Sequence, residues 1–231
     1  MSYVLRVVLP DRPGMLGAVA TALGGVDADI LAMDVVERSR GQAVDDLVVD
    51  LPRTRQPDAL ITAAESVPGV RVESVRPDPG VADVRREWEL VEAVAADPAK
   101  AVSTLAFMLP MVLRVGWAAV VEVDRAGRVS VAATGGGAPD LERIEPGWAP
   151  VSRATVLDEE AGWVPESWQL VSTYLAAAPL GTVDTTVLVG RPGGPALRAS
   201  EVARLGHLAG LTAVVAGRTP ELLQAGDPAD R

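Results

Sequence analysis

Residues 3–23 read YVLRVVLPDRPGMLGAVATAL, and the hydrophobic pattern of this stretch changes its period in the middle. Up to Leu9, side chains alternate in the manner of a β-strand, with Tyr3, Leu5 and Val7 on one face. Further on, apolar residues recur at helical spacing, at Leu16, Val19, Ala20 and Leu23. The stretch therefore predicts a strand that enters a helix through the turn Asp11-Arg12-Pro13-Gly14.

The residues of this turn suit the start of a helix and the approach of a ligand. Pro13 fixes a helical φ in the first turn, where its missing N–H costs little, and Gly14 lets a ligand come close to the backbone. The N–H groups of Gly14, Met15 and Leu16 lack partners within the helix, so this end of the helix favours an anion. Asp11 precedes them and can cap the helix or bind a cation. An amino acid carries both a carboxylate and an ammonium, and it is the ligand that we expect.

The rest of the first 77 residues continues the same type of fold. The pattern predicts three further strands, at 30–36, 44–51 and 70–75, and a second helix at 58–67. Gly24-Gly25 ends the first helix, and Ser39-Arg40-Gly41 joins two strands into a hairpin. On the second helix, the residues expected to face the core are Leu60, Ile61, Ala64 and Val67. The order β-α-β-β-α-β is that of a ferredoxin-like split unit.

This order, the motif Asp11-Arg-Pro-Gly-Met-Leu16 and the sequence Ala28-Asp-Ile30 resemble an ACT domain over residues 1–77. ACT domains are small regulatory modules, and many of them bind amino acids. The family usually pairs two modules side by side and binds its effector at the seam. The resemblance therefore implies a homodimer with an amino acid as its small-molecule partner.

The resemblance also implies which residues bind the ligand. They are Asp11, Gly14, Met15 and Leu16 on one side of the seam, and Asp29 and Ile30 on the other. Asp29 replaces the amide that amino-acid-binding relatives often carry, which favours contact with an ammonium, whereas Leu9 stands where some relatives have a polar contact. The alternative is that Asp11 only caps the helix, that Asp29 is a solvated acid, and that the module is a pairing surface without a ligand.

Composition excludes several classes of function. Of 231 residues, 48% are hydrophobic but only 3% are aromatic, so Val, Leu and Ala must form the core. A net charge of −10 argues against nucleic acid and against an anionic membrane as partners. The absence of cysteine excludes disulfides, thiolate metal sites and a cysteine nucleophile, and it fits a cytoplasmic protein. No apolar run is long enough for a signal peptide or a membrane span.

The second half of the sequence is expected to form a separate domain at residues 83–218. A linker at 78–82 precedes this domain, and a polar tail at 219–231 follows it. Its first helix is expected to bury Val84, Trp88, Val91 and Ala95, and its second helix to run from Ala99 to a stop near Pro110. The pattern predicts strands at 117–123, 129–133, 174–180 and 185–191, and a closing helix at 199–217. These elements predict an antiparallel sheet with flanking helices, so the whole chain is expected to be α+β.

The strands at 175–181 and 185–191 and the helix that follows Pro195 resemble the end of a GAF-like domain. GAF domains are sensory modules that hold small ligands over a sheet or mediate dimers. Three tryptophans, Trp148, Trp163 and Trp168, lie in the irregular segment between the strands. They either cover a pocket as a lid or fill gaps in a core that is otherwise built from small residues.

The chain shows no group of residues that predicts catalysis. No nucleophile with a base and no metal cluster is visible, and His207 is the single histidine. We therefore expect no catalytic residue, no metal site and no cofactor. The leading hypothesis is a non-catalytic regulatory protein, an amino-acid-sensing ACT dimer coupled to a GAF-like sensory module. The alternative is a structural adaptor or regulatory subunit that dimerises and docks a partner enzyme or regulator without a ligand, and the third hypothesis is an enzyme.

Overall fold

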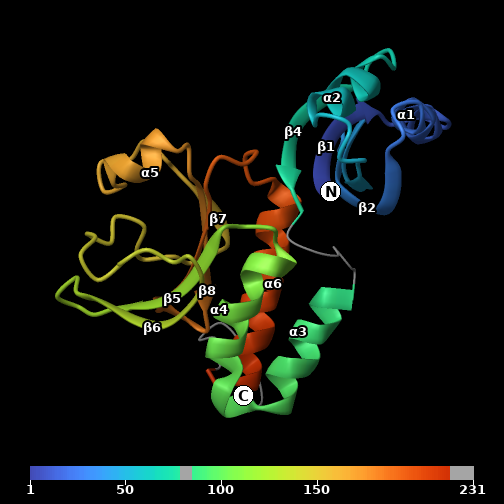
Figure 1. The fold of residues 1–231 in the computed structure, drawn as a ribbon. Helices are drawn as coiled ribbons and strands as arrows, with labels where there is room; N and C mark the ends of the chain where they lie inside the picture. Colours follow the sequence, from blue (N-terminus) through green and yellow to red (C-terminus); the bar gives the residue numbers. More distant parts are fainter. Residues whose placement is uncertain (79–84, 219–231) are drawn as a thin grey trace. The chain divides into compact units, whose positions relative to one another are not determined.

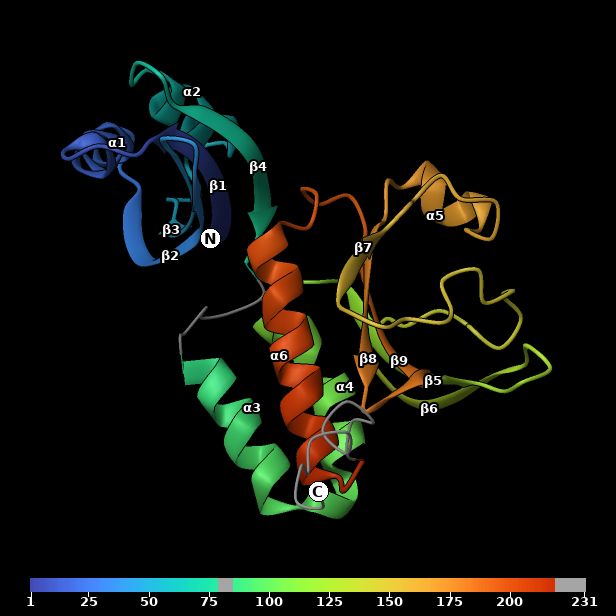
Figure 2. The ribbon, with the colours of Figure 1, turned by 180° about the vertical axis from the view of Figure 1, so that it is seen from behind.

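The computed structural model describes residues 1–78 and 85–218. The chain divides into two compact units, Met1–Val84 and Arg85–Arg231 (Figure 1 and Figure 2). Each unit has one antiparallel sheet with helices, so the predicted α+β class is confirmed. Except for Asp78, the predicted linker lies outside the described residues, as does the predicted polar tail.

The first unit has the predicted order of elements. They are β1 (Ser2–Pro10), α1 (Met15–Gly24), β2 (Asp29–Ser39), β3 (Gln42–Asp50), α2 (Asp58–Glu65) and β4 (Arg71–Pro77). The four strands form an antiparallel sheet in the order β2-β3-β1-β4, so β1 is central and β2 and β4 are the edges.

The core of this unit lies between the sheet and its two helices. Leu5, Val7 and Leu9 of β1 belong to one cluster with Val19 of α1 and Leu60 of α2. The residues that alternate along the opening strand and those at helical spacing after it therefore pack in one core. The predicted face of α2 is wrong at Ile61, which is exposed, because Ala63 and Ala64 fill the space beside Leu60.

The second unit has more elements than its pattern predicts. They are α3 (Arg85–Ala96), a short 3-10 helix (Pro98–Lys100), α4 (Ala101–Val112), β5 (Trp117–Val123), β6 (Val129–Gly136), β7 (Thr155–Leu157), α5 (Glu166–Leu170), β8 (Tyr174–Leu180), β9 (Thr182–Arg191) and α6 (Ala199–Val215). The strands form an antiparallel sheet in the order β6-β5-β9-β8-β7. Helices α3, α4 and α6 lie on one side of this sheet, and α5 lies on the other (Figure 1).

The predicted buried face of α3 is correct at Val91, which packs against the core, but wrong at Trp88 and Ala95. Trp88 is 68% exposed, whereas Leu90 and Val94 are fully buried. An ion pair accompanies this orientation of the helix, since Arg204 Nε on α6 lies 2.6 Å from Glu87 Oε1. Glu87 thus faces α6, and Leu90 and Val94 follow it at helical spacing on the same face. Val84, which was expected on the buried face, lies outside the described residues.

Two further predictions in this unit need correction. Helix α4 does not stop near Pro110 but continues to Val112, and a hydrogen bond of 2.9 Å from the Leu113 N–H to the Leu109 carbonyl closes its last turn. The strand predicted at 129–133 continues to Gly136, so Gly135 and Gly136 lie in β6. A Cβ atom at Gly135 would collide with the backbone of Ala106, so this glycine allows α4 to pack against β6.

Four of the five tryptophans, all except the exposed Trp88, pack in the layer on the α5 side of this second sheet. Trp148 is buried and packs edge-on against Trp163 with 5.0 Å between ring centroids, and Trp117 and Trp168 pack at 5.3 Å. They share a core cluster with apolar side chains from the strands, such as Val121. Of the two interpretations of these residues, the structure therefore favours the filling of gaps.

Candidate functional site

The turn between β1 and α1 owes its shape to Gly14. Helix α1 begins at Met15, and Gly14 precedes it with φ +90°, a left-handed conformation that glycine adopts without a steric penalty. No side chain caps this helix, so the hypothesis that Asp11 is a cap is wrong. Pro13 precedes the helix instead of lying in its first turn, because the left-handed Gly14 separates them.

Two backbone hydrogen bonds fix this turn. The Asp11 N–H donates to the Gly41 carbonyl of the β2–β3 hairpin at 2.9 Å, and the Ala18 N–H of α1 donates to the Gly14 carbonyl at 2.9 Å. The Met15 N–H, one of the three donors expected to face an anion, lies 3.4 Å from the Arg12 carbonyl. This contact is long for an amide hydrogen bond and leaves the group able to turn toward a ligand.

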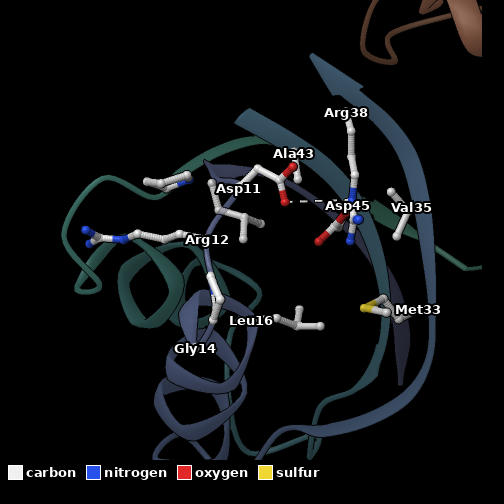
Figure 3. A pocket seen from close by; sticks show the side chains of 12 residues that line it. Asp11, Arg12, Gly14, Leu16, Met33, Val35, Arg38, Ala43 and Asp45 are labelled. Atoms are coloured by element: carbon white, nitrogen blue, oxygen red, sulfur yellow. Dashed lines mark ion pairs between the residues drawn. The ribbon is translucent and has the colours of Figure 1, made fainter. Parts of the chain in front are cut away.

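A pocket of about 370 Å³ lies beside the turn, between the start of α1 and strand β2 (Figure 3). Its apolar wall consists of Leu9, Leu16, Met33, Val35 and Ala43. The other residues that line it are Pro10, Asp11, Arg12, Pro13, Gly14, Arg38 and Asp45. The pocket therefore joins an apolar surface to charges of both signs.

The structure brings three of the six predicted ligand-binding residues to this pocket, namely Asp11, Gly14 and Leu16. Met15 is buried in the core and does not line it. Asp29 and Ile30 lie at the other end of the sheet, because Asp29 pairs with Asp50, which pairs with Ser2. Asp11 follows the last residue of β1, so roughly 25 Å of strand separates it from Asp29 within one module. The predicted seam would have to join these two ends from different copies.

Asp45 also lines the pocket, although the sequence did not predict it as a site residue. It lies on β3 opposite Val7 and Val35, and it is only 4% exposed. Its Oδ1 atom has no hydrogen-bond partner among the residues that the structure describes. Burial raises the pKa of the Asp45 carboxyl, and the Arg38 guanidinium opposes this rise. An acid at a position where the strand alternation requires an apolar side chain was the signal available in the sequence.

The neighbouring acid, Asp46, has a different environment on the opposite face of β3. Arg6 Nε donates to Asp46 Oδ1 at 2.7 Å, and Arg6 Nη2 donates to Asp46 Oδ2 at 2.9 Å. Both side chains of this bidentate ion pair are buried. Asp46 is thus a structural partner of β1, whereas Asp45 faces the pocket.

Arg38 is the cation beside Asp45 in the pocket (Figure 3). Its side chain is 64% exposed, and its Nε atom lies 3.8 Å from Asp11 Oδ1. An exposed ion pair of this length contributes little to stability, so the guanidinium is free to take another anionic partner.

Two smaller pockets lie in the second unit. One of about 310 Å³ is lined by nine residues that include Asp124, Arg125 and Asp184, and one of about 350 Å³ is lined by Glu159, Glu160, Gln169, Ser172, Thr173 and Tyr174. Within residues 1–78 and 85–218, no group of three or more histidine, cysteine or acidic side chains is placed to hold a metal. No helix in the described part of the chain is long and apolar enough to cross a membrane.

Comparisons with solved structures give similarities of low identity. The chain is similar to the GAF domain of a phosphoenolpyruvate-protein phosphotransferase from Acinetobacter, with 11% identity, a TM-score of 0.45 and coverage of 64% of this chain and 97% of that one. It is similar to free methionine-R-sulfoxide reductase from Neisseria meningitidis in complex with its substrate, with 16% identity, a TM-score of 0.48 and coverage of 63% and 96%. It is also similar to a GAF domain assigned to a sensor histidine kinase from Pseudomonas syringae pv. tomato. The identity is 17%, the TM-score is 0.43, and the match covers 62% of this chain and 92% of that one. No curated protein matches the sequence significantly.

The family comparison concerns the first unit. Residues 3–69 match the model of the ACT domain family. This range contains β1, the turn with Gly14, helix α1, the β2–β3 hairpin and α2, and the topology of the unit is that expected for the family. The amino-terminal unit of this chain therefore contains a segment that matches the ACT domain family, and we call it the ACT unit.

Proposed function

We propose that this chain is a non-catalytic regulatory protein whose ACT domain binds an amino acid. The pocket beside the turn between β1 and α1 is the observation that carries this proposal. Its lining combines acids, arginines and an apolar wall, which are the partners that an ammonium, a carboxylate and an apolar side chain require. The second unit, which has the GAF-like architecture expected from the sequence, would relay the signal or sense one of its own.

The size of the pocket supports a small ligand. Pockets that enclose drug-sized molecules measure about 300–1,000 Å³, and this one lies near the lower bound with about 370 Å³. Its open side runs along β2, where Met33 and Val35 are 43% and 40% exposed. An amino acid would cover both side chains and remove apolar surface from water.

Thermal-shift measurements on the full chain with each of the twenty common amino acids test this proposal. A ligand that binds the native state raises its apparent stability by mass action, so at least one amino acid should raise the melting temperature in a concentration-dependent manner. No shift with any of the twenty at millimolar concentration would contradict the proposal.

A matched pair of variants locates the binding site. Val35→Trp places a large ring in the pocket, whereas Leu31→Trp changes an exposed side chain of the same strand that does not line the pocket. The thermal shift should disappear in the Val35 variant and persist in the Leu31 variant. Equal shifts in both variants would place the ligand elsewhere.

The second candidate function is an adaptor that dimerises and docks a partner enzyme or regulator without a ligand. Exposed aromatic side chains favour it, because Trp88 on α3 and Phe107 on α4 are 68% and 67% exposed. Contiguous apolar patches on a surface mark interaction sites, and the two helices that carry these side chains pack against each other. The ligand screen separates the two candidates, since an adaptor of this kind gives no shift.

A further inference from the structure

Asp45 is a buried acid with an incomplete set of partners. Its neighbours across the sheet are Val7 and Val35, and its Oδ1 atom lacks a hydrogen bond among the described residues although solvent does not reach it. Buried polar atoms in native proteins are nearly always hydrogen-bonded, and an exception calls for a reason. In the pocket wall, the most direct reason is a ligand that supplies the missing donor.

The charges around Asp45 indicate what this ligand carries. Arg38 lies next to Asp45 at the pocket, as Figure 3 shows, and its only ion pair within the described residues is the long contact with Asp11. In an α-amino acid, a single carbon joins the ammonium to the carboxylate, so the two charges need an acid and a base that lie side by side. Asp45 and Arg38 provide this arrangement on adjacent strands.

The apolar wall indicates the type of side chain. Leu16 of α1 and Met33 and Val35 of β2 line the pocket on either side. A polar or charged ligand side chain would lose water against these residues without gaining hydrogen bonds. An apolar side chain would bury its own surface and theirs.

We propose that Asp45 binds the ammonium and Arg38 binds the carboxylate of an α-amino acid with an apolar side chain, within a single ACT unit. This assignment rests on the proposed function and replaces Asp11 and Asp29 as partners of the ammonium. Asp11 lies beside Arg38 at the mouth of the pocket, where its own contact is with a cation. Asp29 lies at the opposite end of the sheet.

Calorimetric titration of the full chain with three matched probes tests the two charge contacts. L-leucine has both charges, 3-methylbutylamine has only the ammonium, and 4-methyl-2-oxopentanoate has only the carboxylate. L-leucine should bind at least about tenfold more tightly than either analogue, because each analogue loses one charge-assisted hydrogen-bonding group. L-valine and L-methionine should bind with affinities similar to that of L-leucine.

Variants then assign the contacts to residues. Asp45→Asn should weaken the binding of L-leucine by about tenfold or more, and Asp58→Asn, an exposed acid at the start of α2, should leave it unchanged. Arg38→Gln should weaken the binding of L-leucine by a similar factor. It should leave the binding of 3-methylbutylamine unchanged, since this amine has no carboxylate. Arg38 is exposed, so this second variant tests the assignment even if Asp45→Asn does not fold.

The outcomes distinguish this assignment from the proposed function. If an amino acid binds to the wild type and equally well to the Asp45 and Arg38 variants, the assignment is wrong and the proposed function stands. The same holds if only polar amino acids bind. If none of the twenty amino acids binds, both are wrong.

Discussion

At the scale of single residues, two neighbouring acids on β3 show how alternation along a strand separates structure from function. Asp46 points to the face where Arg6 forms a buried bidentate ion pair with it. Asp45 points to the pocket, where burial disfavours its charge and Oδ1 has no donor among the described residues. Removing the charge should therefore have opposite effects at the two positions.

We predict that Asp46→Asn lowers the free energy of unfolding by about 3–5 kcal/mol, because it removes the charged bidentate partner of a buried guanidinium. Asp45→Asn should leave this free energy unchanged or raise it when no ligand is present. Urea unfolding at neutral pH measures both variants. A large loss of stability in the Asp45 variant would show that this carboxylate is a structural group.

The pH dependence of stability gives a separate prediction for Asp45. The pKa of Asp45 is raised in the folded state, so the unfolded chain loses this proton at a lower pH than the folded chain does. The free energy of unfolding should therefore fall as the pH rises from the ordinary pKa of 3.8 through the folded pKa. The charged groups that act on it are Arg38, Asp11, Asp46 and Asp34. The unfolding free energy of Asp45→Asn minus that of the wild type should therefore become more positive as the pH rises over this range. A difference that decreases over the same range would contradict the raised pKa.

At the scale of the elements, the sequence predicts those whose period is set locally. The strand and helix of the opening stretch follow directly from the alternation before Pro10 and the spacing after Gly14, and the structure confirms both. The face of α3 could be predicted only in part, because two apolar stripes compete on it. The ion pair between Glu87 and Arg204, residues far apart in the sequence, accompanies the burial of Leu90 and Val94.

The candidate site was partly predictable for the same reason. The turn motif identified Asp11, Gly14 and Leu16, which are close in sequence and line one pocket. Asp45 and Arg38 reach the pocket only because the β2–β3 hairpin folds back beside α1, which is a matter of tertiary packing. Strand alternation could have drawn attention to Asp45, but only the structure shows that its Oδ1 atom is buried without a partner.

Two glycines near the start of α1 allow a matched test of the turn. Gly14 has φ +90°, which a residue with a Cβ atom adopts at a penalty of about 1–3 kcal/mol, so Gly14→Ala should destabilise the unit by that amount. Gly17 lies inside the helix with open space around it, so Gly17→Ala should stabilise the unit by up to about 1 kcal/mol. Thermal unfolding of both variants gives the comparison. Equal effects of the two substitutions would mean that the left-handed turn is not required.

At the scale of the whole molecule, the sheet of the first unit has one edge strand with an exposed apolar surface. Strand β1 is buried on both faces because it is central in the sheet. The edge strand β2 instead carries exposed apolar side chains, with Leu31 at 56% and Met33 at 43%. An exposed apolar edge strand is a ready template for pairing with another chain.

We therefore predict that the full chain is a homodimer in solution through its ACT units. Light scattering coupled to size-exclusion chromatography should give twice the mass of the chain at micromolar concentration. Leu31→Lys places a charge on the β2 edge and should shift the equilibrium toward monomer, whereas Ile61→Lys on α2 should not. A monomer at all accessible concentrations would contradict the prediction.

If the ACT unit holds an amino acid between the start of α1 and strand β2, a crystal structure of the full chain grown with L-leucine should show the ligand there. We expect the ammonium within hydrogen-bond distance of Asp45, the carboxylate at Arg38 and the side chain against Leu16, Met33 and Val35. L-leucine bound elsewhere, or an empty pocket in crystals grown at saturating L-leucine, would contradict this expectation.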